Sequence, residues 1–559
     1  MAKIHNLKIK NFRGIKDFDY TFGQSNFICL VGRGDSCKTS IIEAISYVLY
    51  SNWKMLVSDS DFFDCNTSNS IEIEVTLRDV NEKLLTDSKY GLYVRGLHSD
   101  GETVCEDIVE GQEKLLTIIL KIEKDLEPKW FVSSKRANQE DKRIETSDRA
   151  SFNVFLLSDY LDKHFSWSKG TPLYSLLKKD GLEIDNTNLL EAIRTLREKM
   201  EEVDFKELDP IVEEVQKTAL RLGVSIDDIK TSVDMGNISI RDGKIILHDG
   251  AVPLKFKGKG SKRITSIAIQ SESAKEGILL LDEIEQGLEP DRVCNLVRTL
   301  FCNTNEQTFI TTHSQHVVEE IESENIFIVN NDKGRVTIKK GTEDENYKKL
   351  FRSCPAGLYA NRIIVCEGKT EVGFCRAIDK KRILLNKPSL AALGIVYVHG
   401  GGDGFNQKAK DLKTLGKDVC IFCDSDKDSE ILNPTKEELR GMGICIFDCE
   451  TGNNIEEQIM SELPWGGVEE LYEYIKRTTK IDDFDKHIEQ VSSKKFTNSD
   501  DGESREAFCL TSVKKGVFKR IDRGEFLGDT CFKYKEELSE ESFLKKQIEK
   551  IDKWICYGE

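Results

Sequence analysis

Residues 27–39 read FICLVGRGDSCKT, an apolar strand pattern that leads into a glycine-rich loop ending in lysine and threonine. Residues 40–49 then place apolar side chains at helical spacing. A strand, a loop and a helix in this order form a P-loop, whose backbone N–H groups and helix N-terminus bind phosphate. Lys38 would reach the β- and γ-phosphates, and Thr39 would ligate magnesium. The residues that we expect to contact ATP here are Arg13, Gly32, Gly34, Asp35, Ser36, Cys37, Lys38, Thr39 and Ser40.

One position of this loop departs from the usual pattern. Cys37 stands directly before the lysine, where a glycine is expected. The Cβ of a cysteine crowds the backbone next to the phosphates, although a small thiol can be tolerated. We therefore expect ATP to bind, whereas fast ATP hydrolysis is less expected.

Two later motifs fit the same nucleotide chemistry. Residues 278–283 read ILLLDE, so Asp282 and Glu283 follow a buried strand. Asp282 would support magnesium, and Glu283 would polarise the attacking water. A further strand at residues 308–312 leads to His313, which is suited to sensing the γ-phosphate of ATP.

A basic, glycine-rich loop precedes these two motifs. Residues 256–263 read FKGKGSKR and open a helix predicted at residues 264–270. Such a loop at a helix N-terminus binds phosphate, and Gly260 and Ser261 are its candidate contacts. A basic surface turn is an equally weighted interpretation. Together the motifs resemble the ATPase heads of the SMC-like class of cassette ATPases, in which the matching loop contacts ATP bound by a partner subunit.

A long insertion separates Lys38 from Asp282. Residues 155–235 are rich in helical patterns but lack the sustained heptads of a coiled-coil arm. We therefore predict a compact helical dimerisation insert inside the ATPase domain.

Beyond residue 345 the strand pattern restarts, and acidic residues follow several strands. Glu367 and Glu371 come after the strand at 361–366, and Asp424 and Asp426 come after the strand at 417–423. Parallel α/β sheets bind ligands at the carboxyl ends of their strands. Carboxylate oxygens suit magnesium or manganese, and two such ions can activate water and stabilise a leaving oxygen. Glu456 offers a further carboxylate, with Glu457 as the alternative.

This second half resembles a TOPRIM domain, and the tandem resembles the OLD (overcoming lysogenization defect) family of nucleases, including Gabija nucleases and retron-associated anti-phage effectors. The resemblance implies a two-metal site formed by Glu367, Glu371, Asp424, Asp426 and Glu456. It also implies a late lysine near the scissile phosphate, for which Lys515 is our candidate and Lys514 the close alternative. A basic patch that faces DNA or solvent explains these lysines nearly as well.

The resemblance implies an α/β protein: an ABC/SMC-like ATPase head with a helical dimerisation insert, followed by a Rossmann-like TOPRIM domain. We place the ATPase at residues 1–154 and 236–345, the insert at 155–235, and the TOPRIM domain with a C-terminal helical extension at 346–559. ATP and Mg²⁺ or Mn²⁺ are the expected cofactors.

Composition limits the other possibilities. The net charge of −17 argues against a generally basic protein that coats nucleic acid, although a local basic groove remains compatible with it. The apolar runs are strand-sized and no signal peptide is recognisable, so we expect no membrane partner. Sixteen cysteines then indicate the reducing cytoplasm. Cys420 and Cys423 form a CxxC in an apolar run, which favours buried thiols over a zinc site.

The leading hypothesis is an ATP-regulated, metal-dependent DNA endonuclease that acts in anti-phage defence. The family resemblance implies a homodimer or higher homo-oligomer, and the acidic exterior leaves room for a protein or ribonucleoprotein partner. Two alternatives stay open. In the first, the protein is an ATP-sensing scaffold that binds nucleic acid or a partner without cleaving. In the second, it is an ATP-driven DNA repair factor that depends on hydrolysis through Glu283.

Overall fold

The structure is a computed structural model of the 559-residue chain. It describes residues 2–49, 55–157, 164–167, 171–179, 191, 195, 199, 210, 247–274, 277–302, 306–425, 433–478, 484–494, 496–497 and 499–557. The chain divides into two compact units, of which the first comprises Met1–Leu156 with Glu276–Glu559 and the second Leu157–Lys275. In the described part of the chain, no helix is both long and apolar enough to cross a membrane.

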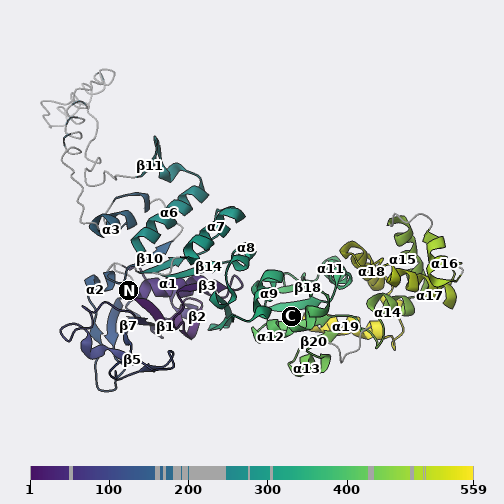
Figure 1. Ribbon diagram of the computed structural model, residues 1–559, viewed down its shortest axis with the longest axis horizontal. Coiled ribbons are helices and arrows are strands. Elements are labelled where there is room, and N and C mark those ends of the chain that lie inside the picture. Colours follow the sequence, from purple (N-terminus) through teal and green to yellow (C-terminus); the bar gives the residue numbers. More distant parts are fainter. Residues whose placement is uncertain are drawn as a thin grey trace, which may run out of the picture. The chain divides into compact units, whose positions relative to one another are not determined.

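A large mixed sheet forms the first half of the first unit (Figure 1). Among the described residues it has fourteen strands, in the order β10-β13-β14-β3-β15-β16-β2-β1-β4-β7-β5-β6, with β8 and β9 added beside β7. The strands are β1 (Lys3–Phe12), β2 (Ile15–Thr21), β3 (Phe27–Val31), β4 (Ile71–Arg78), β5 (Arg95–Leu97), β6 (Val104–Cys105), β7 (Lys114–Ile122), β8 (Pro128–Ser133), β9 (Lys142–Arg143), β10 (Val154–Leu157), β13 (Ile278–Leu281), β14 (Gln307–Thr312), β15 (Ile326–Asp332) and β16 (Arg335–Lys340).

The parallel part of this sheet positions the nucleotide motifs. β3 pairs in parallel with β14 and β15, and β14 pairs in parallel with β13. Every residue of β3, β13 and β14 is buried, as expected for parallel strands covered on both faces. The helices of this region are α1 (Lys38–Leu49), α2 (Thr146–Ala150), α7 (Pro290–Phe301) and α8 (Gln315–Glu320).

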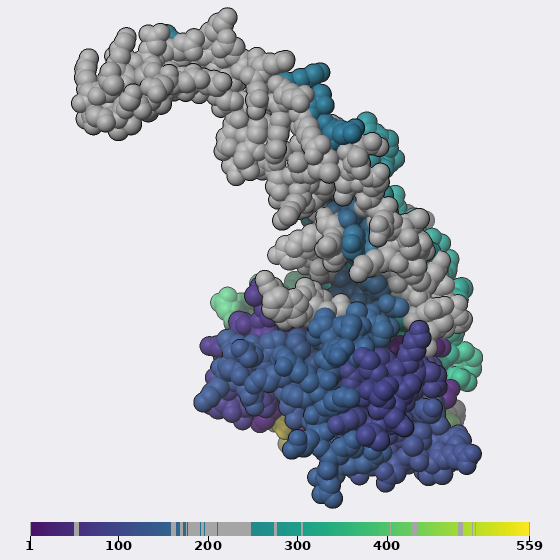
Figure 2. Space-filling model, turned by 90° about the vertical axis from the view of Figure 1, so that its left-hand side faces the viewer, coloured from purple at the N-terminus to yellow at the C-terminus, as the bar shows by residue number. Residues whose placement is uncertain are grey.

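The antiparallel part of the sheet is an N-terminal arm built around β1, β2, β4, β7 and β8. One face of these strands packs its apolar side chains against α1, which contributes Ile41, Ile45 and Val48 to the shared core. The other face is polar. In the space-filling view of Figure 2, the N-terminal arm is purple and blue and presents one continuous surface.

The second unit is described in part. It contains α3 (Pro172–Lys179), β11 (His248–Asp249), β12 (Val252–Pro253) and α6 (Lys259–Ala274), and α3 packs against α6. The predicted insert at 155–235 falls mostly outside the described residues, so its helical structure stays a prediction. The second unit extends to Lys275 and includes α6, which we had placed in the C-terminal part of the ATPase.

A second, four-stranded sheet follows in the first unit, in the order β18-β17-β19-β20, with all pairs parallel. Its elements are β17 (Arg362–Cys366), α11 (Lys369–Leu384), β18 (Ile395–His399), α12 (Phe405–Thr414), β19 (Asp418–Phe422), α13 (Lys436–Gly441) and β20 (Cys445–Phe447). The chain moves from β17 to one side and then returns to its other side, so a topological switch point lies between β17 and β19. This doubly wound parallel order confirms the predicted Rossmann-like domain.

Helices precede and follow this sheet in the chain (Figure 1). They are α9 (Glu345–Ser353), α10 (Pro355–Tyr359), α14 (Ile455–Glu462), α15 (Trp465–Thr478), α16 (Phe484–Ser492), α17 (Gly502–Lys514), α18 (Ile521–Lys533) and α19 (Phe543–Cys556). α18 packs closely on α11 because Gly524 has no side chain. A Cβ at this position would clash with the backbone oxygen of Thr370. This contact brings the α17–α18 connection to the start of α11.

Candidate functional site

The P-loop lysine is the first residue of α1 and is almost completely buried. Its Nζ donates hydrogen bonds to the carbonyl oxygens of Gly32, at 2.9 Å, and Arg33, at 2.8 Å. Burial lowers the pKa of Lys38 to about 8, although the nearby Asp282 and Glu283 act in the opposite direction. The lysine is therefore held inside the loop that it is expected to serve.

Cys37 adopts a left-handed backbone conformation, with φ of +68°. A glycine adopts this conformation without strain, which explains why glycine is expected here. The thiol is turned towards Gly14, where an added Cβ would lie 2.8 Å from Sγ, and Asn331 Nδ2 donates to Sγ at 3.3 Å. The loop thus accommodates the cysteine by packing its side chain on the turn that follows β1.

The ends of β13 and β14 meet the P-loop. Asp282 Oδ1 accepts hydrogen bonds from Thr39 Oγ1 at 3.1 Å and from Thr311 Oγ1 at 2.6 Å. The structure therefore brings together the two residues that we predicted as the magnesium ligands of the nucleotide site. The backbone N–H of Glu283 also donates to Thr311 Oγ1, at 2.7 Å.

His313 lies in the same region. Its backbone N–H donates to Glu285 Oε1 at 2.5 Å, and Thr312 Oγ1 donates to Glu285 Oε2 at 2.8 Å. Burial, followed by the charge of Lys38, lowers the pKa of His313, so its imidazole is neutral at neutral pH. Glu285 holds residues 312–314, which we call the histidine loop, in place. Its position in the sequence after Asp282 did not reveal this role.

Two other predicted ATP contacts have different surroundings. Arg13 forms ion pairs with Glu43 and with Asp61, and thereby ties the turn after β1 to α1. Gly260 and Ser261 lie in the first turn of α6, because this helix begins at Lys259 rather than at the predicted residue 264. They belong to the second unit. ATP contacts from these three residues stay predictions.

Four carboxylates gather at the carboxyl ends of β17 and β19, and we call them the acidic cluster: Glu367, Glu371, Asp424 and Glu456. Glu367 Oε2 accepts the backbone N–H of Asp424 at 3.0 Å, and Asp424 Oδ1 accepts that of Ile455 at 2.8 Å. Glu371 and Glu456, in the first turns of α11 and α14, are buried. The cluster therefore lies at the topological switch point.

The remaining predicted members divide as follows. Glu457 Oε2 accepts the backbone N–H of Asn454 and caps α14, which leaves Glu456 as the member of the cluster. Asp426 lies outside the described residues. Lys514 and Lys515 stand at the end of α17.

Burial and mutual repulsion dominate the electrostatics of the cluster. Burial, and then the charges of Glu371, Glu456 and Glu367, raises the pKa of Asp424 to about 9. Burial, with Glu456 and Glu367 adding to it, raises the pKa of Glu371 to about 7. Burial also raises the pKa of Glu456. Such shifts mean that the cluster favours protons or another cation.

The donor set fits a divalent cation. All four groups offer carboxylate oxygens, the ligands that Mg²⁺ and Mn²⁺ prefer. Among the described residues, no three His, Cys, Asp or Glu side chains are already arranged as a metal-ligand group. The carboxylates thus converge on one region, and ligation requires local side-chain adjustment.

Two residues that the sequence did not single out contact or influence the cluster. Thr370 Oγ1 lies 3.4 Å from Glu456 Oε1 and 3.1 Å from the carbonyl oxygen of Phe518. The charge of Lys519, which follows Phe518, opposes the rise in the pKa of Glu456. The charge of Lys519, four residues beyond our candidate Lys515, therefore acts on Glu456, one member of the cluster.

Lys436 is another residue that sequence reasoning missed. Its Nζ donates to the carbonyl oxygen of Asp424 at 3.1 Å and to Ser425 Oγ at 3.0 Å, and it pairs with Asp448. This buried lysine fixes the backbone after β19. No motif marks it, because it reaches Asp424, twelve residues earlier in the chain, only when α13 is folded against the sheet.

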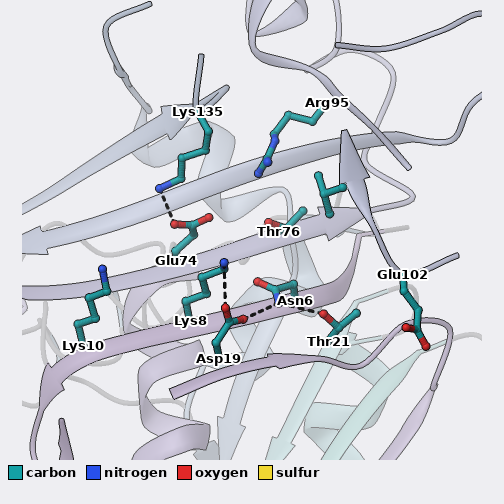
Figure 3. A pocket seen from close by; sticks show the side chains of 11 residues that line it. Asn6, Lys8, Lys10, Asp19, Thr21, Glu74, Thr76, Arg95, Glu102 and Lys135 are labelled. Atoms are coloured by element: carbon teal, nitrogen blue, oxygen red, sulfur yellow. Dashed lines mark hydrogen bonds and ion pairs between the residues drawn. The ribbon is translucent and has the colours of Figure 1, made fainter. Parts of the chain in front are cut away.

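A polar cavity of about 490 Å³ lies elsewhere, on the outer face of the N-terminal arm (Figure 3). Lys8 pairs with Asp19 at 2.9 Å, and Lys135 pairs with Glu74 at 2.5 Å. Asn6 donates to Asp19 Oδ1. Lys8 and Asp19 are a cross-strand pair on β1 and β2, and Lys135, which follows β8, reaches Glu74 on β4. Such pairs of opposite charge stabilise a sheet, so these side chains are explained as structural ion pairs rather than as a reactive site.

The left-handed conformation of Cys37 leads to a prediction for Cys37→Gly. Glycine relieves backbone strain of about 1 kcal/mol and restores the usual loop, so we expect a more stable protein with faster ATP turnover. Phosphate release and thermal unfolding measure the two effects. Cys65→Gly is the matched control, since Cys65 is exposed and has φ of +54°. The control should gain stability without faster turnover; equal turnover in wild type and Cys37→Gly contradicts the prediction.

The raised pKa of Asp424 predicts how stability depends on pH. The folded pKa of about 9 exceeds the ordinary value of about 4, so stability falls as pH rises between the two values. Asp424→Asn removes this charge and keeps an oxygen for the N–H of Ile455. We expect its metal-free unfolding midpoint at pH 8 to exceed that of wild type by about 2 °C or more, with little difference at pH 4.

Mg²⁺ or Mn²⁺ should stabilise wild type more than this variant. The control is Asp448→Asn, which removes a carboxylate paired with Lys436 and Arg440 and should lower stability. An Asp424→Asn midpoint equal to or below that of wild type at pH 8 would show that repulsion in the cluster is weaker than inferred.

Two protein families match the regions of the chain that contain these two sites. The family described as "AAA ATPase domain" matches residues 2–318, and "Overcoming lysogenization defect protein-like, TOPRIM domain" matches residues 358–426. No curated protein matches the chain.

Three solved structures with low similarity are Smc heads. A "SmcHead bound to the C-winged helix domain of ScpA" is 17% identical, covering 62% of this chain and 99% of that chain with a TM-score of 0.36. A Pyrococcus furiosus Smc head with an extended coiled coil, bound to the C-terminal domain of ScpA, is 15% identical (61% and 97% covered; TM-score 0.35). The Thermotoga maritima SMC head domain is 13% identical (61% and 99%; TM-score 0.29).

The first family match spans more than half of the chain and contains the P-loop, Asp282 and His313. The second begins at α10 and contains Glu367, Glu371 and Asp424. The chain belongs to the AAA ATPase domain family and joins this domain to a TOPRIM domain of the overcoming lysogenization defect type.

Proposed function

We propose that this protein is a divalent-metal-dependent DNA endonuclease that ATP regulates, and that it is a cytoplasmic effector of anti-phage defence. The observation that carries the proposal is the acidic cluster at the switch point of the TOPRIM sheet. Burial and repulsion raise the pKa of three of its carboxyl groups, so a bound cation that neutralises their charge stabilises the site. A structural ion-pair network would supply that cation from its own side chains.

The cluster would hold Mg²⁺ or Mn²⁺ through Glu367, Glu371, Asp424 and Glu456, together with Asp426. A bound divalent cation supplies the charge that activates water and stabilises the leaving oxygen of a phosphodiester. The chain itself provides backbone N–H groups that orient Glu367 and Asp424. Lys519 would lie beside the scissile phosphate. The effect of its charge on the pKa of Glu456 supports this role. Lys515 stays an alternative.

The nucleotide site supports ATP binding with magnesium held through Thr39 and Asp282. Glu283 would polarise water, and neutral His313 would sense the γ-phosphate. The left-handed Cys37 favours slow turnover, and slow turnover suits a nucleotide that sets the state of the enzyme. ATP and DNA would then be coupled ligands, each changing the affinity of the other.

DNA binding by a chain of net charge −17 needs a local basic surface. Residues 514–523 supply one at the end of α17, the connection and the first turn of α18, and they include Lys514, Lys515, Lys519, Arg520 and Arg523. This connection reaches the acidic cluster through Thr370. The proposal includes a homodimer or higher homo-oligomer formed through the ATPase domain and insert.

The decisive test is plasmid cleavage with Mg²⁺ or Mn²⁺, with and without ATP, by wild type and Glu367→Gln. Glutamine can still accept the N–H of Asp424 but cannot offer a carboxylate. We expect cleavage by wild type and a loss of about 100-fold or more in the variant, with unchanged ATP binding. Glu457→Gln, which alters the cap of α14 and removes a charge beside Glu456 but removes no member of the acidic cluster, is the control and should cleave normally.

Full cleavage by Glu367→Gln rejects the acidic cluster as the active site. Absence of cleavage by wild type with either metal favours the scaffold alternative, in which the TOPRIM half only binds. Cleavage that requires ATP hydrolysis, and therefore Glu283, favours the repair alternative.

A second prediction separates the two candidate lysines. Lys519→Ala should lower the cleavage rate by about 100-fold, because it removes a positive charge at the site where negative charge develops. Lys515→Ala should reduce the rate by about threefold or less, as expected for a contact with the DNA backbone alone. The comparison is made at saturating DNA and metal. The reverse order of the two effects would assign the role to Lys515.

A further inference from the structure

The nucleotide site and the acidic cluster are joined by a short stretch of chain. α10 ends at Tyr359, and β17 begins at Arg362 and leads directly to Glu367. β17 is an inner strand of the TOPRIM sheet, paired with β18 and β19 over its whole length. A displacement at the start of β17 is therefore shared by the strands that carry the cluster.

Tyr359 contacts the histidine loop of the nucleotide site. Its hydroxyl donates a hydrogen bond to the carbonyl oxygen of Ser314 at 3.0 Å. Its ring lies 6.0 Å from that of His313, at an interplanar angle of 30°. Burial raises the pKa of Tyr359, so the hydroxyl stays protonated and able to donate. Ser314, which follows the predicted γ-phosphate sensor His313, is thus hydrogen-bonded to α10, the helix that precedes β17.

Two more contacts involve the starts of the TOPRIM strands, one from the P-loop and one from α10. The guanidinium of Arg33, in the P-loop, occupies the space where a side chain at Gly394 would begin, directly before β18. Lys417, directly before β19, is buried and donates to the carbonyl oxygen of Leu358 in α10 at 3.0 Å. β17 follows α10 directly in the chain, and the starts of β18 and β19 contact the P-loop and α10, respectively.

We propose that Tyr359 is a positioning residue that transmits the state of the nucleotide site, through the Ser314 hydrogen bond and β17, to Glu367. The inference rests on the proposed function, in which ATP regulates cleavage by this chain. When His313 moves to meet a γ-phosphate, Ser314 moves with it, and the hydroxyl of Tyr359 draws the end of α10 along. Tyr359 touches neither ATP nor DNA and acts only through its neighbours.

The test uses the full-length protein and Tyr359→Phe, which keeps the ring and removes only the donor. Hydrogen exchange is measured by mass spectrometry with and without a non-hydrolysable ATP analogue and Mg²⁺. In wild type we expect the analogue to slow exchange at residues 30–45 and also at 360–368. In the variant, protection at 30–45 should persist, and protection at 360–368 should fall to less than half.

The matched control is Tyr347→Phe, a half-buried tyrosine of α9 whose ring packs on Phe351. It should behave as wild type. In parallel, the ratio of cleavage rates with and without ATP should move towards one in Tyr359→Phe by about threefold to tenfold, the change expected for one hydrogen bond. Cleavage without nucleotide should stay within about twofold of wild type, as for a residue outside the active site.

Equal protection of 360–368 in wild type and Tyr359→Phe overturns the inference, as does a wild type in which the analogue protects only 30–45. Loss of protection at 30–45 in the variant would show that Tyr359 supports nucleotide binding itself and would also overturn it. Failure of the proposed nuclease activity is recognised separately, as absent plasmid cleavage by wild type, because the exchange measurement requires no cleavage.

Discussion

Parallel strand pairing is the constraint on which both sites depend. Val31 pairs with Thr312 at the end of β3 and β14, so the P-loop and the histidine loop leave the sheet side by side. Cys366 pairs with Phe422 at the end of β17 and β19, so Glu367 and the Asp424 loop do the same. Residues far apart in the sequence meet because parallel strands end at a common edge. The chemistry of each site is then decided by the side chains that this edge receives.

The two edges receive opposite balances of charge. In the nucleotide site, Lys38 lies among Asp282, Glu283 and Glu285, so the chain supplies a cation of its own. In the acidic cluster, Glu371 raises the pKa of Asp424, Glu456 and Glu367 raise the pKa of Glu371, and the charge of Lys519 opposes the rise in the pKa of Glu456. Protons neutralise the cluster when no metal is bound. Cation binding must displace those protons, which makes metal affinity increase with pH.

The sequence predicted the strand ends well because an apolar run followed by a carboxylate is a local pattern. It predicted Asp282, Glu367 and Asp424 for this reason, and Glu456 with one neighbour as the alternative. The sequence did not predict residues whose position depends on how separate helices and strands pack together. Lys519 acts on the cluster because glycines let α18 approach α11, and Lys436 reaches Asp424 through α13. The start of α6 was misplaced by five residues, since basic residues and glycine suggested a loop.

The nucleotide loops contact the TOPRIM sheet at the amino ends of its strands. The acidic cluster lies at the carboxyl ends of these strands. Tyr359 and Gly394 precede their strands, whereas Glu367 and Asp424 follow theirs. A strand of five residues, such as β17, spans roughly 17 Å, and its hydrogen bonds to two neighbours resist bending. Such a strand moves as a rigid body more readily than it deforms. Under the proposed coupling, a small shift at its start would therefore reach Glu367 and change how the four carboxylates are placed to hold a cation.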